Sequence, residues 1–286
     1  MSINKDRPFR PTRIVLNFAH RCNMDCEWCY VPFMGEGPDP DICNRIIERS
    51  AQLGFKIITL AGGDPMLYSF LPELIESAKK CGLFVHVDTN GIGLQCTDKT
   101  ASLMGERIDL LGLPLDGPRA EIHNQMRSAR SHFELVLDRL IWLAPFAHKI
   151  KINTFVSSRN ANTILEMTPL IESCNPSRWS LYQYWPLSLG RIAAGEHSIS
   201  NERFLEIVER LPALVGRAQV EINSLPLRRL TYPFVSHEGT IYAHNQNDQS
   251  AYESLGPIFD DAVMAELFAR CGAERENAAS RYPLER

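Results

Sequence analysis

Three cysteines within eight residues form the stretch of this sequence that is best suited to chemistry. Cys22, Cys26 and Cys29 stand in HRCNMDCEWCY, residues 20–30, and are separated by three and then two residues. A structural zinc ion takes four protein ligands, so His20 would have to complete a Cys3His site. An iron–sulfur cube takes one thiolate per iron, so three thiolates leave the fourth iron open to bind another molecule. Both metals are therefore candidates at this point.

A second motif, AGGDP, occupies residues 61–65 at the end of an apolar run. Glycines allow the backbone to approach a ligand closely, and here they are followed by the carboxylate of Asp64. A ligand that carries an ammonium group would suit such a place.

The elements that position these motifs alternate between short β-rich runs and amphipathic helical stretches. Six strands are predicted, at residues 13–19, 56–62, 84–90, 108–116, 149–156 and 178–185. Six β-then-α units predict a parallel sheet with helices outside, and they are two fewer than a closed barrel has. The predicted fold class is α/β, a partial (βα)6 TIM-type barrel with a small C-terminal α+β extension. The cysteines then lie at the carboxyl end of the first strand, where barrels of this type place their chemistry.

The alternation of predicted strands and helices stops after residue 186. A helix is predicted over residues 200–211, a hairpin that turns at Glu238-Gly239, and a last helix over residues 260–272. We therefore divide the chain into a barrel core, residues 1–190, and an extension, residues 191–286, in which helix, hairpin and helix pack on the barrel.

Composition narrows the classes of partner. The 286 residues are 44% hydrophobic and 22% charged with a net charge of −4, so no basic surface indicates nucleic acid. We see no apolar run of the ~20 residues that cross a bilayer and no signal peptide at the N-terminus. We therefore expect a cytoplasmic protein with no membrane partner, whose clustered cysteines serve metal binding or catalysis.

Taken together, the motifs resemble those of the radical S-adenosylmethionine enzymes. That family has C-x3-C-x-aromatic-C after the first strand, which Cys22, Cys26, Trp28 and Cys29 match. Its Gly-Gly-Glu-Pro element after the second strand, which holds the amino group of S-adenosylmethionine, is matched with Asp64 in place of Glu. Because Asp is one carbon shorter, its contact with that group is expected through water or to be carried by the backbone. TNG at residues 89–91 and LDGPRAEIHNQMR at residues 115–127 also look like family elements, although Pro114 stands where Ser is common. The resemblance covers roughly residues 13–185 and favours the cluster over zinc.

The resemblance implies a 4Fe–4S cluster and S-adenosyl-L-methionine as cofactors. In this family the reduced cluster passes an electron to the sulfonium of S-adenosylmethionine and cleaves its C5′–S bond, which gives methionine and a 5′-deoxyadenosyl radical. A flavodoxin or ferredoxin is the implied electron donor. The implied metal ligands are Cys22, Cys26 and Cys29. The implied residues that bind S-adenosylmethionine are Trp28, Gly62, Gly63, Asp64, Pro65, Thr89, Asn90 and Arg127, with Arg127 suited to the carboxylate.

Substrate residues are predicted from the fifth and sixth strands. Alternation places Lys151 and Asn153 on one face, inside the barrel near a substrate. The alternative is that Lys149 and Lys151 lie at the solvent-facing start of an edge strand. Gln183, flanked by aromatics, could contact a base or a sugar, or belong to the core. Residues 151–183 resemble the viperin branch of the family, which dehydrates a nucleotide. The predicted substrate is therefore a small polar molecule such as a nucleotide, nucleoside or sugar.

Several alternatives remain at this point. Cys271 could return a hydrogen atom to a substrate radical, as in some epimerases of the family, or be a small buried apolar residue. The other functional alternatives are peptide modification, a degenerate barrel that binds S-adenosylmethionine without cleaving it, and a zinc-stabilised binding module.

Overall fold

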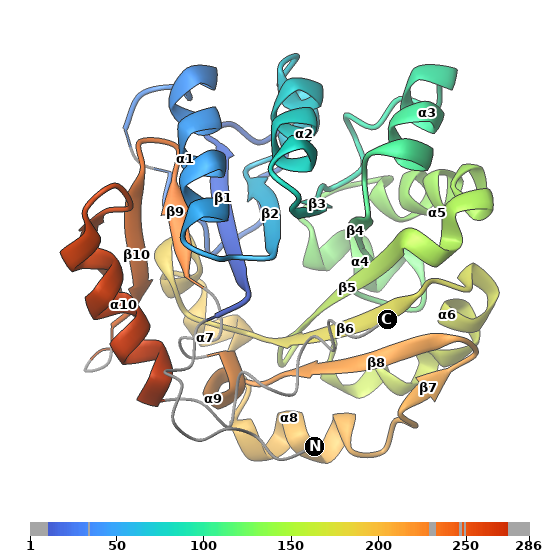
Figure 1. Ribbon diagram of the computed structural model, residues 1–286. Coiled ribbons are helices and arrows are strands. Elements are labelled where there is room, and N and C mark those ends of the chain that lie inside the picture. Colours follow the sequence, from blue (N-terminus) through green and yellow to red (C-terminus); the bar gives the residue numbers. More distant parts are fainter. Residues whose placement is uncertain (1–10, 34, 229–232, 246–247, 249, 274–286) are drawn as a thin grey trace, which may run out of the picture.

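The computed structural model of the chain describes residues 11–33, 35–228, 233–245, 248 and 250–273. One curved, open sheet runs through the molecule in the strand order β11-β10-β9-β1-β2-β3-β4-β5-β6-β8-β7 (Figure 1). The six central strands are β1 (Arg13–Ala19), β2 (Ile57–Gly62), β3 (Phe84–Asp88), β4 (Leu110–Pro114), β5 (Ile150–Val156) and β6 (Arg178–Gln183). Each of these strands pairs in parallel with the next, which confirms the predicted partial barrel.

The helices lie outside this curved sheet (Figure 1). Those between the central strands are α1 (Pro40–Gln52), α2 (Leu71–Lys80), α3 (Asp98–Glu106), α4 (Ala120–Met126), α5 (His132–Trp142) and α6 (Thr168–Cys174). The apolar face of α2 shows why it covers the sheet, since Leu71, Leu74, Ile75 and Ala78 follow helical spacing and are all buried. Within the described ranges, no helix combines the length and the hydropathy that crossing a bilayer requires.

Alternation along the strands separates an apolar outer layer from a polar interior. In β5, Ile150, Ile152 and Val156 belong to the large apolar core beneath the helices. Lys151 lies on the other face and is fully buried inside the barrel, next to Asn153. The interior position of Lys151 is therefore confirmed over the edge-strand alternative, because β5 lies between β4 and β6.

The segment after residue 190 adds strands to both edges of the sheet. The hairpin is formed by β9 (Phe234–Ser236) and β10 (Thr240–His244), and it turns at Gly239 with φ +89°. The expected helices are α8 (Asn201–Val208) and α10 (Asp261–Ala273). The sequence did not predict β7 (Leu214–Val215), β8 (Ala218–Asn223) or β11 (Tyr252–Pro257), of which β8 pairs in parallel with β6. Two one-turn helices complete the segment, α7 (Ala194–His197) and α9 (Leu225–Arg228).

Candidate active site

The three clustered cysteines line a cavity of about 950 Å³ at the carboxyl ends of the central strands. None of the three is in a disulfide. The same cavity wall includes most of the residues that the sequence assigned to S-adenosylmethionine, namely Trp28, Gly62, Gly63, Thr89, Asn90 and Arg127. Residues that lie far apart in the sequence are thus brought to one place by the parallel strands that precede them.

Gly62 and Gly63 bring the end of β2 against the start of the cysteine loop. The Gly63 amide donates to the carbonyl of Ala19 at 2.6 Å, and the Asp64 amide donates to that of Arg21 at 2.9 Å. Gly62 has φ +123°, and an added Cβ would lie 2.5 Å from the Ala19 carbonyl oxygen. At Gly63 a Cβ would lie 2.1 Å from the Arg21 oxygen. The two glycines are therefore required by the backbone that carries Cys22.

Replacing Gly63 with alanine tests this packing. We expect Gly63→Ala to lower the iron bound per chain at least severalfold after anaerobic reconstitution, because the new methyl group displaces the backbone before Cys22. Gly37→Ala is the control, since nothing lies within 4 Å of a Cβ at Gly37. An iron content in Gly63→Ala equal to that of the control would contradict this account.

Asp64 is fully buried and does not reach the cavity wall. Its carboxylate accepts hydrogen bonds from the Met66 amide at 2.8 Å, the Asn90 amide at 2.9 Å and the Thr89 hydroxyl at 2.9 and 3.0 Å. Burial raises the pKa of Asp64, and these donors oppose that effect. The short side chain thus joins β2 to the loop after β3, so that a contact with a ligand's ammonium group stays an expectation for water or for the backbone and not for this carboxylate directly. Pro65, also buried, begins the short 3-10 helix η1 (Pro65–Leu67) behind the wall.

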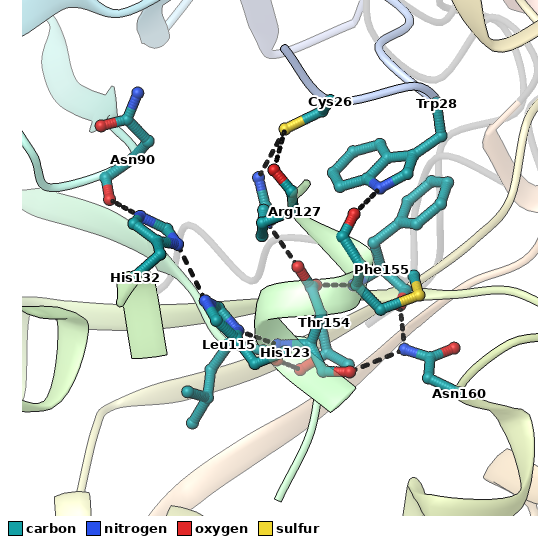
Figure 2. A network of polar contacts seen from close by, with 12 residues as sticks. Cys26, Trp28, Asn90, Leu115, His123, Arg127, His132, Thr154, Phe155 and Asn160 are labelled. Atoms are coloured by element: carbon teal, nitrogen blue, oxygen red, sulfur yellow. Dashed lines mark hydrogen bonds and ion pairs between the residues drawn. The ribbon is translucent and has the colours of Figure 1, made fainter. Parts of the chain in front are cut away.

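Arg127, at the end of α4, contacts the cysteine loop directly (Figure 2). Its Nη1 lies 3.9 Å from Cys26 Sγ, and its Nε forms a short ion pair with Asp116. The guanidinium also lies 4.6 Å from the ring of Trp28, which stacks on Phe155 with centroids 3.8 Å apart. Burial alone would lower the pKa of Arg127, but Asp116 and Cys26 raise it above its usual value. A permanent positive charge therefore lies beside Cys26.

Two buried histidines connect this arginine region to Asn90 (Figure 2). The Asp116 amide donates to His123 Nδ1 at 3.0 Å, so that nitrogen carries no proton. His123 Nε2 must then donate to His132 Nδ1 at 2.8 Å, and His132 Nε2 must donate to the Asn90 carbonyl at 2.8 Å. The chain of hydrogen bonds therefore fixes both rings as the neutral Nε2–H tautomer.

Asn90 completes the connection to a second cysteine. Its side-chain amide lies 3.6 Å from Cys22 Sγ and 2.7 Å from Asn23 Oδ1. Cys22 and Cys26 are thus each contacted by a residue of one continuous hydrogen-bonded network, although they belong to a loop without helix or strand. That network holds the loop in place.

The segment after β6 forms the opposite wall of the cavity. The Gly190 amide donates to the Cys29 carbonyl at 3.1 Å. Arg159 forms ion pairs with Glu27 of the cysteine loop, at 3.4 Å, and with Glu196 of α7. This irregular segment has no periodic pattern, and its cavity residues Ala193, Gly195 and Glu196 were not predicted for that reason.

Of the predicted substrate residues, only Asn153 lies on the cavity wall. Its amide donates to Asp88 at 2.8 Å. Lys151 lies behind the wall, where it donates to the Tyr182 hydroxyl at 2.8 Å and pairs with Glu221 of β8 at 3.8 Å. The predicted substrate contact of Lys151 is therefore corrected to a structural one, since β8 supplies the carboxylate that a buried ammonium needs.

Gln183 is also corrected. Its amide donates to the Ile199 carbonyl at 3.2 Å, and its oxygen accepts from the Leu225 amide at 2.8 Å. The side chain is fully buried and lies off the cavity wall, so it connects β6 to the segments before α8 and within α9.

Cys271 does not belong to the site. It lies on α10, fully buried in the apolar core, where burial raises the pKa of its thiol to about 12. The hypothesis that it returns a hydrogen atom to a substrate in the cavity is wrong, because its thiol faces the core between helices and sheet and is absent from the cavity wall.

A Cys271→Ala variant is expected to form product at the rate of the unaltered protein, because no cavity atom is changed. The loss of one buried sulfur atom should lower the free energy of unfolding by about 1 kcal/mol. Product formation and urea denaturation measure the two effects. A tenfold loss of turnover in a folded Cys271→Ala protein would restore the cysteine to the mechanism.

The donor set in the cavity fits an iron–sulfur cluster. Burial raises the pKa of Cys29 to about 12 and also raises those of Cys22 and Cys26, so a metal must displace the thiol protons as it binds. Three soft thiol ligands face a volume large enough for a cluster and a further ligand. His20 is the fourth ligand that the zinc alternative requires. Its ring packs edge-on against two other rings, with centroids 5.6 Å from that of His237 and 6.5 Å from that of Phe33.

Comparison with known proteins agrees with this chemistry. Residues 16–157 match the family model described as the radical SAM superfamily. A protein of Flammeovirga pacifica named S-adenosylmethionine-dependent nucleotide dehydratase is 25% identical over 274 residues, which cover 85% of this chain and 90% of that protein. An AdoMet-dependent heme synthase of Oleidesulfovibrio alaskensis is 27% identical over 201 residues, 68% of this chain and 51% of that protein. The chain spans only 37% of the length of another nucleotide dehydratase, from Lacinutrix mariniflava.

Solved structures share the fold. The enzyme anSMEcpe with bound AdoMet superposes with a TM-score of 0.69 at 17% identity, over 94% of this chain and 84% of that one. SuiB of Streptococcus suis bound to S-adenosylmethionine gives 0.68 at 12% identity, over 90% of this chain and 65% of that one. At such identities these likenesses concern the fold alone, and they confirm the open barrel.

Proposed function

This chain belongs to the radical S-adenosylmethionine superfamily, and from that premise we propose that it cleaves S-adenosylmethionine reductively to act on a small, nucleotide-like substrate. Its cofactors are those of the superfamily, a 4Fe–4S cluster and S-adenosylmethionine. One observation carries the proposal for this chain. Three cysteine thiols share a cavity wall with Trp28 and with the glycine and Asn90 loops.

In this proposal Cys22, Cys26 and Cys29 hold the cluster. When bound, the two cofactors supply a 5′-deoxyadenosyl radical, which takes a hydrogen atom from a substrate. Arg127 lies on the cavity wall beside Cys26 and offers a fixed positive charge to the carboxylate of S-adenosylmethionine. The backbone at Gly62 and Gly63, also on the wall, is left to bind the ammonium group, because the Asp64 carboxylate lies off the wall and already accepts from the Met66 and Asn90 amides and from the Thr89 hydroxyl.

Nucleotide dehydration is the reaction we favour. The supporting observation is that the likeness to the Flammeovirga dehydratase extends over nearly the whole of both chains, beyond the barrel core. The cavity of about 950 Å³ exceeds the space that one drug-sized ligand needs, so a substrate can lie beside S-adenosylmethionine. The polar side chains of Asp88, Asn153 and Tyr182 line it and suit a substrate rich in hydroxyl groups.

The proposal extends to the electron donor and to the cellular location. A flavodoxin or ferredoxin would deliver the electron, since a 4Fe–4S cluster must be reduced before cleavage. A cytoplasmic location would keep the thiols of Cys22, Cys26 and Cys29 reduced and available to the cluster.

The test is anaerobic. The protein is reconstituted with iron and sulfide, reduced with dithionite and given S-adenosylmethionine with CTP, GTP, UTP, the nucleosides or sugar phosphates in turn. We expect 5′-deoxyadenosine to form, to rise with one nucleotide, and to be absent in Cys26→Ala. A cluster-loaded protein that forms none with any of these compounds would reject the proposed substrate class.

A further inference from the structure

Arg228 is a buried cation on the cavity wall that the sequence did not single out. It ends α9, and its side chain is only 6% exposed. The guanidinium carbon lies 4.4 Å from the ring centroid of Trp185 and 5.3 Å from that of Tyr182. All three residues line the cavity.

The polar atoms of Arg228 are not fully paired within the described ranges. Nη1 donates to the Gln183 carbonyl at 3.2 Å, whereas Nε is buried and has no hydrogen-bond partner there. Contact with aromatic rings stabilises the cation from its faces but leaves the N–H groups at its edge to find acceptors. A buried polar group of this kind is costly until an acceptor arrives.

Two carboxylates near this wall are engaged with other groups. Asp88 accepts from Asn153 and lies beside His86. Glu221, behind the wall, pairs with Arg178 and Lys151. Neither of these two carboxylates is paired with Arg228 in the described part of the chain.

Arg13 is another buried arginine of this cavity wall. Arg13 lines the same cavity and is 5% exposed, with its Nε donating to the Thr59 hydroxyl at 2.7 Å. Its Nη2 lies 3.2 Å from His86 Nδ1, and its charge helps to lower the pKa of Asp88. Arg13 therefore serves a carboxylate of the protein, which leaves Arg228 as the arginine that carries the argument.

We propose that Arg228, held against Trp185 and Tyr182, anchors an oxyanion of the substrate, either a phosphate or a carboxylate. The inference rests on the proposed function, because it assigns the substrate's oxyanion to one end of the same cavity. Arg127 lies at the cysteine end for the carboxylate of S-adenosylmethionine, so the anion at Arg228 belongs to a second molecule. A guanidinium suits both oxyanions, since its N–H groups form a planar fork.

Binding is measured by calorimetry on the reconstituted, S-adenosylmethionine-loaded protein under anaerobic conditions at fixed ionic strength. The probes are CTP, cytidine, inorganic pyrophosphate and glutarate. We expect the Kd for the anionic probe that binds to rise about 10- to 100-fold in Arg228→Met, because charge-assisted hydrogen bonds are lost while the stacked stem remains. Preference for CTP and pyrophosphate identifies the anion as phosphate, and preference for glutarate identifies it as carboxylate.

Arg203→Met is the matched control, since Arg203 is exposed on α8 and pairs there with Glu206. Iron content and near-ultraviolet circular dichroism establish folding, and Arg228→Lys, which keeps the charge, replaces Arg228→Met if the latter does not fold. Equal affinity of unaltered protein and variant for the anion, or no anion binding by the unaltered protein, would overturn the inference. Failure of the proposed function is a separate result, the absence of 5′-deoxyadenosine from cluster-loaded enzyme.

Discussion

Asp116→Asn is expected to lower the free energy of unfolding by about 3–5 kcal/mol, the usual cost of removing one charged partner from a buried ion pair. Asp116 is fully buried and Arg127 nearly so, so the variant leaves the guanidinium without its counter-charge. The Asp116 carboxylate also accepts from the Phe155 amide at 2.7 Å. Urea denaturation of the cluster-free protein measures the effect.

The matched control is Asp261→Asn. Asp261 also pairs with an arginine, Arg49, but its side chain is 91% exposed. Solvent screens such a pair, so the control should lose no more than about 1 kcal/mol. Equal losses in the two variants would show that burial does not decide the strength of the Asp116 pair.

The same variant links stability to the site. Arg127 contacts Cys26 Sγ and the Trp28 ring, so an arginine released from Asp116 no longer fixes the cysteine loop. Iron bound per chain should therefore fall in Asp116→Asn even under conditions where the protein stays folded. The control variant should retain the iron content of the unaltered protein.

The central strands were predictable because they carry a strong local signal. Apolar runs such as residues 13–19 are buried on both faces of a parallel sheet, and helices separate them at regular intervals. The cysteine and glycine motifs were also predictable, since their spacing reflects direct chemistry. By contrast, β8 was not predicted, although its short sequence AQVEIN alternates apolar and polar residues with the period of a strand.

The errors at the site share a physical cause. The sequence placed Lys151 correctly inside the barrel, but it could not reveal that Glu221, seventy residues later, would arrive beside it on β8. The Asp64 carboxylate lies off the cavity wall, where the Thr89 hydroxyl and two backbone amides donate to it. The pairing of a polar side chain depends on neighbours distant in sequence, so pattern alone assigns a face and not a partner.

The pH dependence of stability follows from the buried histidine pair. Burial lowers the pKa of His123 to about 2, and burial also lowers that of His132. The hydrogen bonds require the same result, because a proton added at either Nδ1 would point at a neighbouring N–H group. Both rings therefore stay neutral in the folded protein at pH values where the unfolded chain takes up protons.

The free energy of unfolding should consequently fall as the pH drops below about 6.5, the pKa of a histidine in the unfolded chain. The unfolded state then binds up to two more protons than the folded state, which costs up to about 2.7 kcal/mol per pH unit for the pair. Above pH 7 both states hold neutral rings, so these two residues contribute no slope there. Urea denaturation at pH 7, 6 and 5 measures the dependence.

One substitution separates this pair from the other titrating groups. His123→Gln keeps an acceptor for the Asp116 amide and a donor for His132, but it removes one of the two protons that the unfolded chain gains. The slope between pH 6 and 5 should decrease by about 1.4 kcal/mol per pH unit relative to the unaltered protein. His148→Gln, at an exposed position outside this hydrogen-bonded chain, is the matched control. If His123→Gln kept the full slope, the ring at position 123 would have to titrate alike in both states, and the neutral chain from Asp116 to Asn90 would be wrong.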